Sequence, residues 1–286
     1  MGQRCLDGIR LLPMEEVMKD LAGRVAVITG GASGIGFATA KELAKEGMRL
    51  VLADIEQSAL DSAAHELSQS GAEVIGVKTD VGDLGQVQKL ADITFQHFGA
   101  AHVVFNNAGV AVFGPVQEMS HADWEWIMKV DLWGPIHGVE AFLPRIIEQQ
   151  QGGHIVNTAS FAGLVANQGL SVYCVAKYGV VALSECLAKD LREHNIGSSV
   201  LCPMVVDTKI NDSARNRPTE FGGPQRDLDV SDEQAEKMRG RVLPVQGVAA
   251  KVVKAIKNNE LYIVTHEESR EFIRRRFERI DKAFDL

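Results

Sequence analysis

The chain alternates short apolar runs, rich in β-branched residues, with segments whose apolar spacing is that of a helix. Strands that are joined through helices run parallel, and a parallel sheet needs helices on both of its faces. The alternation therefore predicts an α/β fold with a doubly wound parallel sheet of about seven strands. The expected strands lie in RVAVIT, RLVLAD, AEVIGVKTD, HVVFNNAG, HIVNTAS, IGSSVLCP and LYIVT.

One domain accounts for most of the 286 residues, because α/β domains commonly reach this length without dividing. We expect it over residues 21–286. Residues 1–20 are interpreted as an N-terminal extension that contributes little, since the apolar run is too short and the acids too many for a signal peptide. Residues from about 208 to 240 are polar and interrupt the alternation, so they predict an irregular substrate lid.

Composition and charge exclude several classes of partner and binding site. The net charge of -8 argues against nucleic acid or a membrane surface as a partner, because either favours a basic face. No apolar stretch approaches the length of a membrane span. The cysteines and histidines show no metal-site spacing and no disulfide framework, so we expect no metal and reduced thiols in the cytoplasm.

The stretch TGGASGIG, residues 29–36, joins the first expected strand to a helix. A tight turn alone would explain the glycines. A phosphate cradle explains them too, because glycine lets a ligand approach the main chain and the amides of a helix start attract an anion. Gly30, Gly34 and Gly36 would be the points of close approach. The spacing G-x-x-x-G-x-G is not the commoner G-x-G-x-x-G. The residues at the other strand ends must therefore decide between a tight turn and a phosphate cradle.

Ligands of a doubly wound sheet bind beyond the carboxyl ends of its strands. Asp54 ends the second expected strand, where a carboxylate can accept hydrogen bonds from ribose hydroxyls and repel a 2′-phosphate. It could also cap the next helix, which is compatible with that role. No basic residue lies in the glycine loop, so NAD is favoured over NADP. Asp80 ends the third strand, at a position suited to the adenine edge, and NNAG ends the fourth.

Tyr173 and Lys177 lie four residues apart in SVYCVAKYG, on one face of an expected helix. A tyrosine pKa of about 10 must fall by about three units, or about 4 kcal/mol, before the phenol is a good base at neutral pH. A lysine ammonium and an oxidised nicotinamide could supply this. Ser160, at the end of HIVNTAS, would meet Tyr173 and donate a hydrogen bond to the substrate. Such a pair alone is more often a surface feature, but here it accompanies the glycine loop.

With these motifs in this order, residues 20–265 resemble the short-chain dehydrogenase/reductases, which share a single-domain Rossmann-type fold. The resemblance implies an NAD-dependent alcohol dehydrogenase or ketone reductase. It implies that Tyr173 is the acid/base, that Ser160 orients the substrate oxygen, and that Lys177 binds the nicotinamide ribose and lowers the tyrosine pKa. Thr208 matches the position that holds the carboxamide. The cofactor-binding residues that it implies are Gly30, Ser33, Gly34, Ile35, Gly36, Asp54, Asp80, Val81, Asn107, Ala108, Gly109, Tyr173, Lys177, Pro203, Val206 and Thr208.

Two positions depart from the family pattern. Asp131, in VDL, stands where the family usually has Asn, a residue that helps to hold a water linking the catalytic lysine to solvent. The resemblance therefore adds Asp131 to the catalytic residues, with the main-chain carbonyl as its expected contribution. Met204, in CPMVVDT, replaces a glycine, so a bulky and flexible thioether should reshape the nicotinamide end of the pocket.

Three stretches, ADWEWIMKVDLWGPIHGVEAFLPRI, ARNRPTEFGG and LYIVTHEESREFIRRRF, are similar to bacterial dehydrogenases that oxidise the benzylic alcohol of lignin-type aryl ethers. Related sequences take other bulky secondary alcohols or ketones. The family also implies a homo-oligomer, a dimer or tetramer. A non-catalytic dinucleotide-binding regulator is the alternative, although it would usually lack the Tyr, Lys or Ser. An epimerase or lyase on this fold usually has a longer chain.

Overall fold

The structure, a computed structural model, describes residues 18–224 and 241–285. Residues 1–17 of the expected extension and residues 225–240 of the expected lid lie outside this part. Met18 already packs into the hydrophobic core and is 3% exposed. The described chain therefore joins the domain slightly before residue 21.

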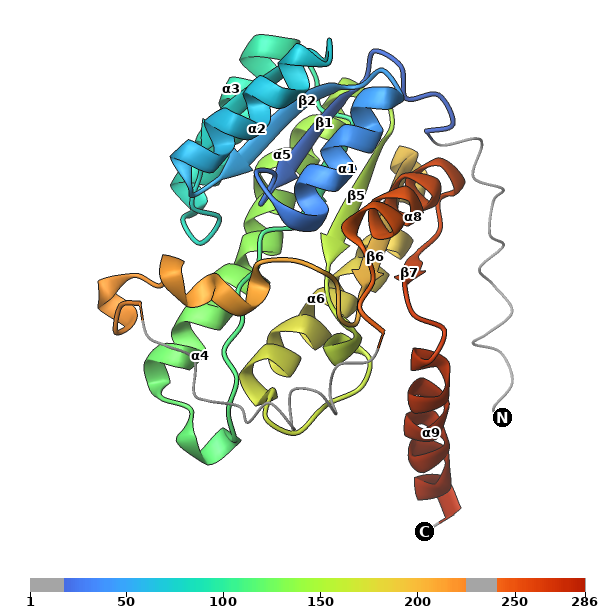
Figure 1. Cartoon of the computed structure of the whole chain (residues 1–286). Coiled ribbons are helices and arrows are strands. Elements are labelled where there is room, and N and C mark those ends of the chain that lie inside the picture. Colours follow the sequence, from blue (N-terminus) through green and yellow to red (C-terminus); the bar gives the residue numbers. More distant parts are fainter. Residues whose placement is uncertain (1–17, 225–240, 286) are drawn as a thin grey trace, which may run out of the picture.

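A parallel sheet in the order β3-β2-β1-β4-β5-β6-β7 forms the centre of the molecule (Figure 1). The prediction of about seven parallel strands is confirmed. Successive strands run outward from β1 to β3, and the chain then returns to place β4 on the other side of β1. This reversal opens a crevice between β1 and β4. The strands are β1 (Val25–Thr29), β2 (Arg49–Asp54), β3 (Val74–Lys78), β4 (Val103–Asn106), β5 (Gly153–Thr158), β6 (Ile196–Cys202) and β7 (Tyr262–Val264).

Helices cover both faces of the sheet, as a parallel sheet requires. Three of them share one hydrophobic cluster with the strands, namely α1 (Gly34–Lys45), α2 (Gln57–Gln69) and α8 (Val245–Asn258). The opposite cluster takes residues from α3 (Leu84–Phe98), α5 (Gly134–Gln149) and α6 (Ser171–Asp190). The chain ends in α9 (Ser269–Asp281), which Figure 1 shows projecting from the body beyond β7.

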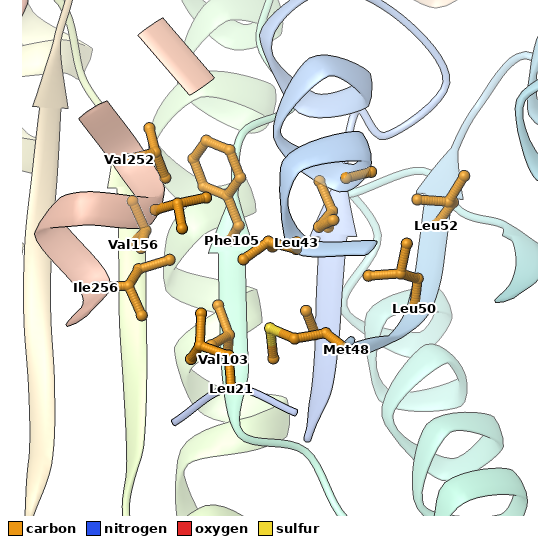
Figure 2. Packing of buried hydrophobic residues seen from close by; sticks show 14 of the residues in the cluster. Leu21, Leu43, Met48, Leu50, Leu52, Val103, Phe105, Val156, Val252 and Ile256 are labelled. Carbon is orange, nitrogen blue, oxygen red and sulfur yellow. The ribbon is translucent and has the colours of Figure 1, made fainter. Parts of the chain in front are cut away.

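The alternation along each strand decides which cluster a side chain joins. Leu50 and Leu52 of β2 point to the α1 side, whereas Val51 between them points to the α3 side. Figure 2 shows Leu50 and Leu52 in the same layer as Leu43 of α1. Both faces of the central strands are thus dry, which explains why these runs are apolar throughout instead of alternating with polar residues.

The long helical stretch in the middle of the chain is not one regular helix. It starts as α4 (His121–Ile127), passes through a π-helical turn at η2 (Met128–Trp133) and continues as α5. Ser120 and Asp123 form a capping box at the start of α4, which satisfies amides that have no partner inside the helix. The π turn carries Asp131, so this departure from regular geometry lies at a residue of the expected site.

Helix α6 is long and apolar enough to cross a membrane by length and composition, the single such helix in the described part of the chain. It packs against β5, β6 and the π turn. Buried helices of folded domains pass the same test of composition. The stretch after β6, expected to form a lid, contains the short helices η5 (Ile210–Asn216) and η6 (Thr219–Phe221).

Candidate active site

A cleft of roughly 1450 Å³ lies at the carboxyl ends of the strands. All the residues that the sequence assigned to the cofactor and the chemistry line it, except Gly36 and Asp131. In Figure 1 the orange segment that follows β6 runs across these strand ends toward α4. The cleft is thus bounded by the sheet on one side and by residues 203–221 on the other.

The glycine loop leaves no room for side chains. A Cβ on Gly36 would lie 2.2 Å from the Gly30 carbonyl oxygen, and one on Gly30 would lie 2.9 Å from the Cα of Ala108. Gly30 and Gly34 also have positive φ angles, +60° and +55°, which glycine adopts without strain. Asn107 holds the loop from β4, because its Nδ2 donates to the carbonyl oxygens of Thr29 at 3.1 Å and Gly30 at 3.3 Å. Gly36 therefore shapes the loop from behind the cleft.

This loop opens into the start of α1, as a dinucleotide cradle requires. Ser33 is the N-cap, but its side chain makes no capping hydrogen bond. Gly34 and Ile35 of the first turn line the cleft together with Thr208, whose Cγ2 lies 3.3 Å from the Cβ position of Gly34. Unpaired amides at a helix start suit a pyrophosphate. The cradle therefore fits a dinucleotide.

Asp54 holds the loop as well as facing the cleft. Its Oδ2 accepts a hydrogen bond from the amide of Ala32 at 3.1 Å, and its Oδ1 accepts one from the amide of Glu56 at 3.1 Å. Burial raises the pKa of Asp54, and these amide bonds oppose that effect. Asp80, after β3, accepts from the amide of Gly82 at 2.8 Å. Two carboxylates thus stand at the end of the cleft where an adenosine would lie.

Ser160 and Tyr173 lie close enough for the serine hydroxyl to lower the pKa of the tyrosine. Ser160 lies just after β5, and Tyr173 lies in the first turn of α6, so the β5–α6 connection brings them together. The Ser160 Oγ also accepts from the amide of Ala162 at 3.1 Å. Burial, followed by the charge of Asp131, raises the pKa of Tyr173 above its usual value. This direction is opposite to the lowering expected of the catalytic state.

Lys177 lies one helical turn after Tyr173 and is 2% exposed. Its Nζ donates to the carbonyl oxygen of Thr158 at 3.0 Å and lies 3.3 Å from Asp131 Oδ2. The distance from Nζ to the centroid of the Tyr173 ring is 5.4 Å. The ammonium therefore lies between the tyrosine and a buried carboxylate, and its field acts on both.

Asp131 brings its side chain to Lys177, and the expected contribution of its main-chain carbonyl remains a prediction. Its Oδ1 accepts a hydrogen bond from the amide of Val110 at 2.8 Å, and its Oδ2 faces Lys177. The side chain is fully buried behind the cleft. Burial raises the pKa of Asp131, and the Lys177 ammonium opposes this rise. Within the described residues, no group of three or more His, Cys, Asp or Glu side chains could hold a metal.

The far end of the cleft is apolar and rich in aromatic side chains. Phe161 and Phe272 meet there edge to face, with ring centroids 5.8 Å apart. Phe272 comes from α9, within the stretch LYIVTHEESREFIRRRF that is similar to aryl-ether dehydrogenases. Met204 lies on the same wall as Pro203. The aromatic residues that line the cleft are Phe113, Trp126, Phe161, Tyr173, Phe221 and Phe272.

Two ion pairs hold the segment after β6 across the cleft, and sequence reasoning found neither of them. Arg217 is buried against Asp123 of α4, and its guanidinium lies 5.2 Å from the centroid of the Trp126 ring. Arg215 pairs with Glu56, which follows β2. The partners lie 94 and 159 positions apart in the chain, so no local pattern could have indicated them.

The fold and the site define a class of proteins: dinucleotide-binding oxidoreductases with a parallel doubly wound sheet, a glycine cradle at its switch point and a Ser-Tyr-Lys group beside it. The family model described as short chain dehydrogenase matches residues 24–219. The chain belongs to the short-chain dehydrogenase family.

Relatives of this chain agree with that assignment. A dehydrogenase/reductase of CLA biosynthesis from Lactiplantibacillus plantarum is 33% identical over 92% of this chain and 95% of the relative. A C alpha-dehydrogenase from Sphingobium sp. strain SYK-6 is 33% identical over 92% of this chain and 87% of the relative. A short-chain dehydrogenase/reductase from Burkholderia phymatum, solved in complex with NAD, is 42% identical with a TM-score of 0.86, over 92% and 95% of the two chains.

The protein is an oxidoreductase that transfers a hydride between NAD(H) and a secondary alcohol or ketone, and its cofactor is NAD. The expected similarity to aryl-ether benzylic alcohol dehydrogenases is confirmed by the Sphingobium relative. Nothing among these comparisons supports the non-catalytic regulator that the sequence left as the alternative.

Proposed function

We propose that this enzyme oxidises bulky secondary alcohols whose carbinol carbon carries an aromatic group. The observation that carries the proposal is the position of Ser160 and Tyr173 in the cleft. Both side chains line the same cleft as the glycine cradle and the edge-to-face pair of Phe161 and Phe272. Aromatic rings prefer offset or edge-to-face neighbours, so an aryl alcohol would complete this wall.

The proposed roles of the side chains follow from their contacts. Ser160 Oγ donates a hydrogen bond to the substrate oxygen, and Tyr173 Oη takes the hydroxyl proton as the alcohol becomes a ketone. NAD, when bound, accepts the hydride that leaves the carbinol carbon. The Lys177 ammonium stabilises the phenolate form of Tyr173. Asp131 fixes the position of that side chain, because its Oδ2 lies 3.3 Å from Nζ.

The proposed cofactor contacts use the rest of the cleft. The loop from Gly30 to Gly36, with Ser33 and Ile35, would hold the pyrophosphate at the start of α1. Asp54 would accept hydrogen bonds from the adenosine ribose, and Asp80 with Val81 would face the adenine. The residues that would line the nicotinamide half are Asn107, Ala108, Gly109, Tyr173, Lys177, Pro203, Val206 and Thr208.

Assembly and location belong to the same proposal. We infer a homo-oligomer, a dimer or tetramer, because Trp133 beside α5 and Val175 of α6 are 50% and 49% exposed and such apolar side chains suit a subunit contact. The described cysteines, Cys174, Cys186 and Cys202, are free thiols, which supports a reducing cytoplasm.

A substrate screen tests the proposed function. Purified enzyme with NAD is offered matched secondary alcohols, one with a phenyl ring on the carbinol carbon and one with a cyclohexyl ring, together with steroid and aliphatic alcohols. We expect the aryl alcohol to give the largest catalytic efficiency. Equal or greater efficiency with the cyclohexyl compound would contradict the aromatic preference, whereas no NADH formation from any alcohol would contradict the alcohol substrates altogether.

A further inference from the structure

A cation reaches the adenosine end of the cleft from a distant part of the chain. Arg215 lies in η5, yet its Nε donates to Glu56 Oε1 at 3.1 Å and its Nη2 contacts the same oxygen. Asn216 Nδ2 donates to that oxygen at 2.8 Å. Arg215 and Glu56 both line the cleft. The glycine loop has no basic residue, but the fold brings Arg215 into the cleft that the loop borders.

The guanidinium of Arg215 does not depend on Glu56 alone for its position. Its Nη1 donates to the carbonyl oxygens of Asp212 at 2.8 Å and Lys209 at 3.3 Å. These bonds hold one side of the fork, so the Nε and Nη2 edge would stay at the cleft if the carboxylate were removed. That edge has the geometry in which arginine takes a phosphate through two hydrogen bonds.

Glu56 lies beside the carboxylate that would bind the ribose. Its amide donates to Asp54 Oδ1 at 3.1 Å, where Asp54 ends β2 and Glu56 follows it. The charged side chains that line the cleft are Asp54, Glu56, Asp80, Glu118, Lys129, Lys177, Lys209, Arg215 and Glu268. In the described part of the chain, Glu56 is the carboxylate partner of Arg215. It therefore neutralises a cation that lines the cleft beside the proposed ribose-binding carboxylate.

We propose that Glu56 is a determinant of the preference for NAD over NADP, and that it acts by occupying the Nε and Nη2 edge of Arg215. A 2′-phosphate would have to displace this carboxylate before it could use the arginine. The pair is partly exposed, with side chains 38% and 34% accessible, so it adds little to folding stability. Its effect is on specificity, which is a difference between two affinities.

The test is isothermal titration calorimetry of the complete chain with NAD and with NADP, in the absence of any alcohol. Glu56→Gln keeps an oxygen for Asn216 but removes the charge, and it should raise the NADP to NAD affinity ratio by about tenfold. Adding Arg215→Ala should return the ratio to within about threefold of the wild type. Glu66→Gln is the matched control, since Glu66 pairs with Lys41 at 2.6 Å on the outer surface.

An unchanged ratio in Glu56→Gln would overturn the proposal, and so would a raised ratio that persists in the double variant. If Glu56→Gln does not fold, Arg215→Ala alone gives the reciprocal result. Without Arg215 the Glu56 carboxylate has lost its ion-pair partner and should repel the 2′-phosphate, so the NADP to NAD affinity ratio should fall. An unchanged ratio in Arg215→Ala would therefore also overturn the proposal. The proposal goes beyond the proposed substrate, because no step of this experiment requires an alcohol.

Discussion

The Asp131 carboxylate lies 3.3 Å from the Lys177 ammonium, and neither side chain is more than 2% exposed. The same ammonium lies 5.4 Å from the centroid of the Tyr173 ring. Because Asp131 raises the pKa of Tyr173, the carboxylate offsets part of the field that the lysine provides. The pKa of Tyr173 is thus held above its usual value, and the buried carboxylate fixes the position of the lysine.

Asp131→Asn should move the alkaline rise of the oxidation rate to lower pH. The substitution removes a negative charge that favours the protonated phenol, so the pKa of Tyr173 falls and the phenolate forms earlier in a titration. The measurement is the pH profile of kcat/KM for oxidation. Asp92→Asn is the matched control, because Asp92 pairs with Arg145 at 2.8 Å on the surface. An apparent pKa that is unchanged or moves upward in Asp131→Asn would contradict this electrostatic role.

Tyr173→Phe should lower turnover by at least about 100-fold, the usual scale for a positioned acid or base. The ring still packs, so the Kd for NAD should change little. Lys177→Ala should damage both turnover and NAD binding, given its two proposed roles. Tyr178→Phe serves as the control, because Tyr178 is on α6 beside Arg276 of α9. Tyr173→Phe activity within about tenfold of the wild type would refute the mechanism.

Asp54→Ala should narrow the gap between NAD and NADP, which we expect to be at least about tenfold in kcat/KM for the unmodified enzyme. The variant removes the charge that repels a 2′-phosphate. It also removes the acceptor for the Ala32 amide, so the Kd for NAD should rise as the glycine loop loosens. Equal efficiencies with the two cofactors in the unmodified enzyme would show the ribose assignment to be wrong.

The described part of the expected lid, residues 208–224, should exchange its amide hydrogens faster than the central sheet in the free enzyme. Protection there should increase when NAD and an alcohol are bound. Arg217→Ala should raise the exchange further, because it breaks the buried pair with Asp123. Hydrogen-exchange mass spectrometry measures this. Protection equal to that of β1 in the free enzyme, unaltered by ligand, would exclude a lid.

Phe272→Ala should raise KM for an aryl alcohol by up to about tenfold, since an aromatic pair contributes about 0.5–1.5 kcal/mol beyond its buried area. KM for a small aliphatic alcohol should hardly change. Phe277→Ala is the control on the same helix, because Phe277 is 58% exposed and does not line the cleft. Steady-state kinetics with the two alcohols would decide, and equal losses for both would exclude an aryl contact at Phe272.

Much of the fold could be predicted because its signals are local. Buried strands of a parallel sheet are apolar on both faces, so runs such as the one from Val25 to Thr29 are visible as sequence. The glycine loop is visible for a similar reason, since Gly30 and Gly36 leave no space for a Cβ. Tyr173 and Lys177 are four residues apart on one helix, and the resemblance supplied Ser160.

The rest of the site depends on contacts between distant positions. Arg215 meets Glu56 and Arg217 meets Asp123 only after the segment beyond β6 crosses the strand ends. Helix α9 shows the same limit, because Phe272 reaches the cleft from a helix whose exposed arginines dominate its sequence. The family pattern pointed to the main chain of Asp131, whereas the closeness of its carboxylate to Lys177 depends on the packing of the π turn against α6. The residues that we assign to specificity are thus far apart in the sequence, whereas Tyr173 and Lys177 are neighbours on one helix.

The π turn at Met128–Trp133 is the kind of feature that a one-residue insertion into a helix produces during evolution. A π turn holds about one residue more than an α turn, so it stores an inserted residue without rotating the helix that follows. Relatives with a continuous helix would align here with a gap of one residue while α4 and α5 keep the same buried faces. Deleting Val130, next to Asp131, should therefore be tolerated far better than a deletion elsewhere in this helix.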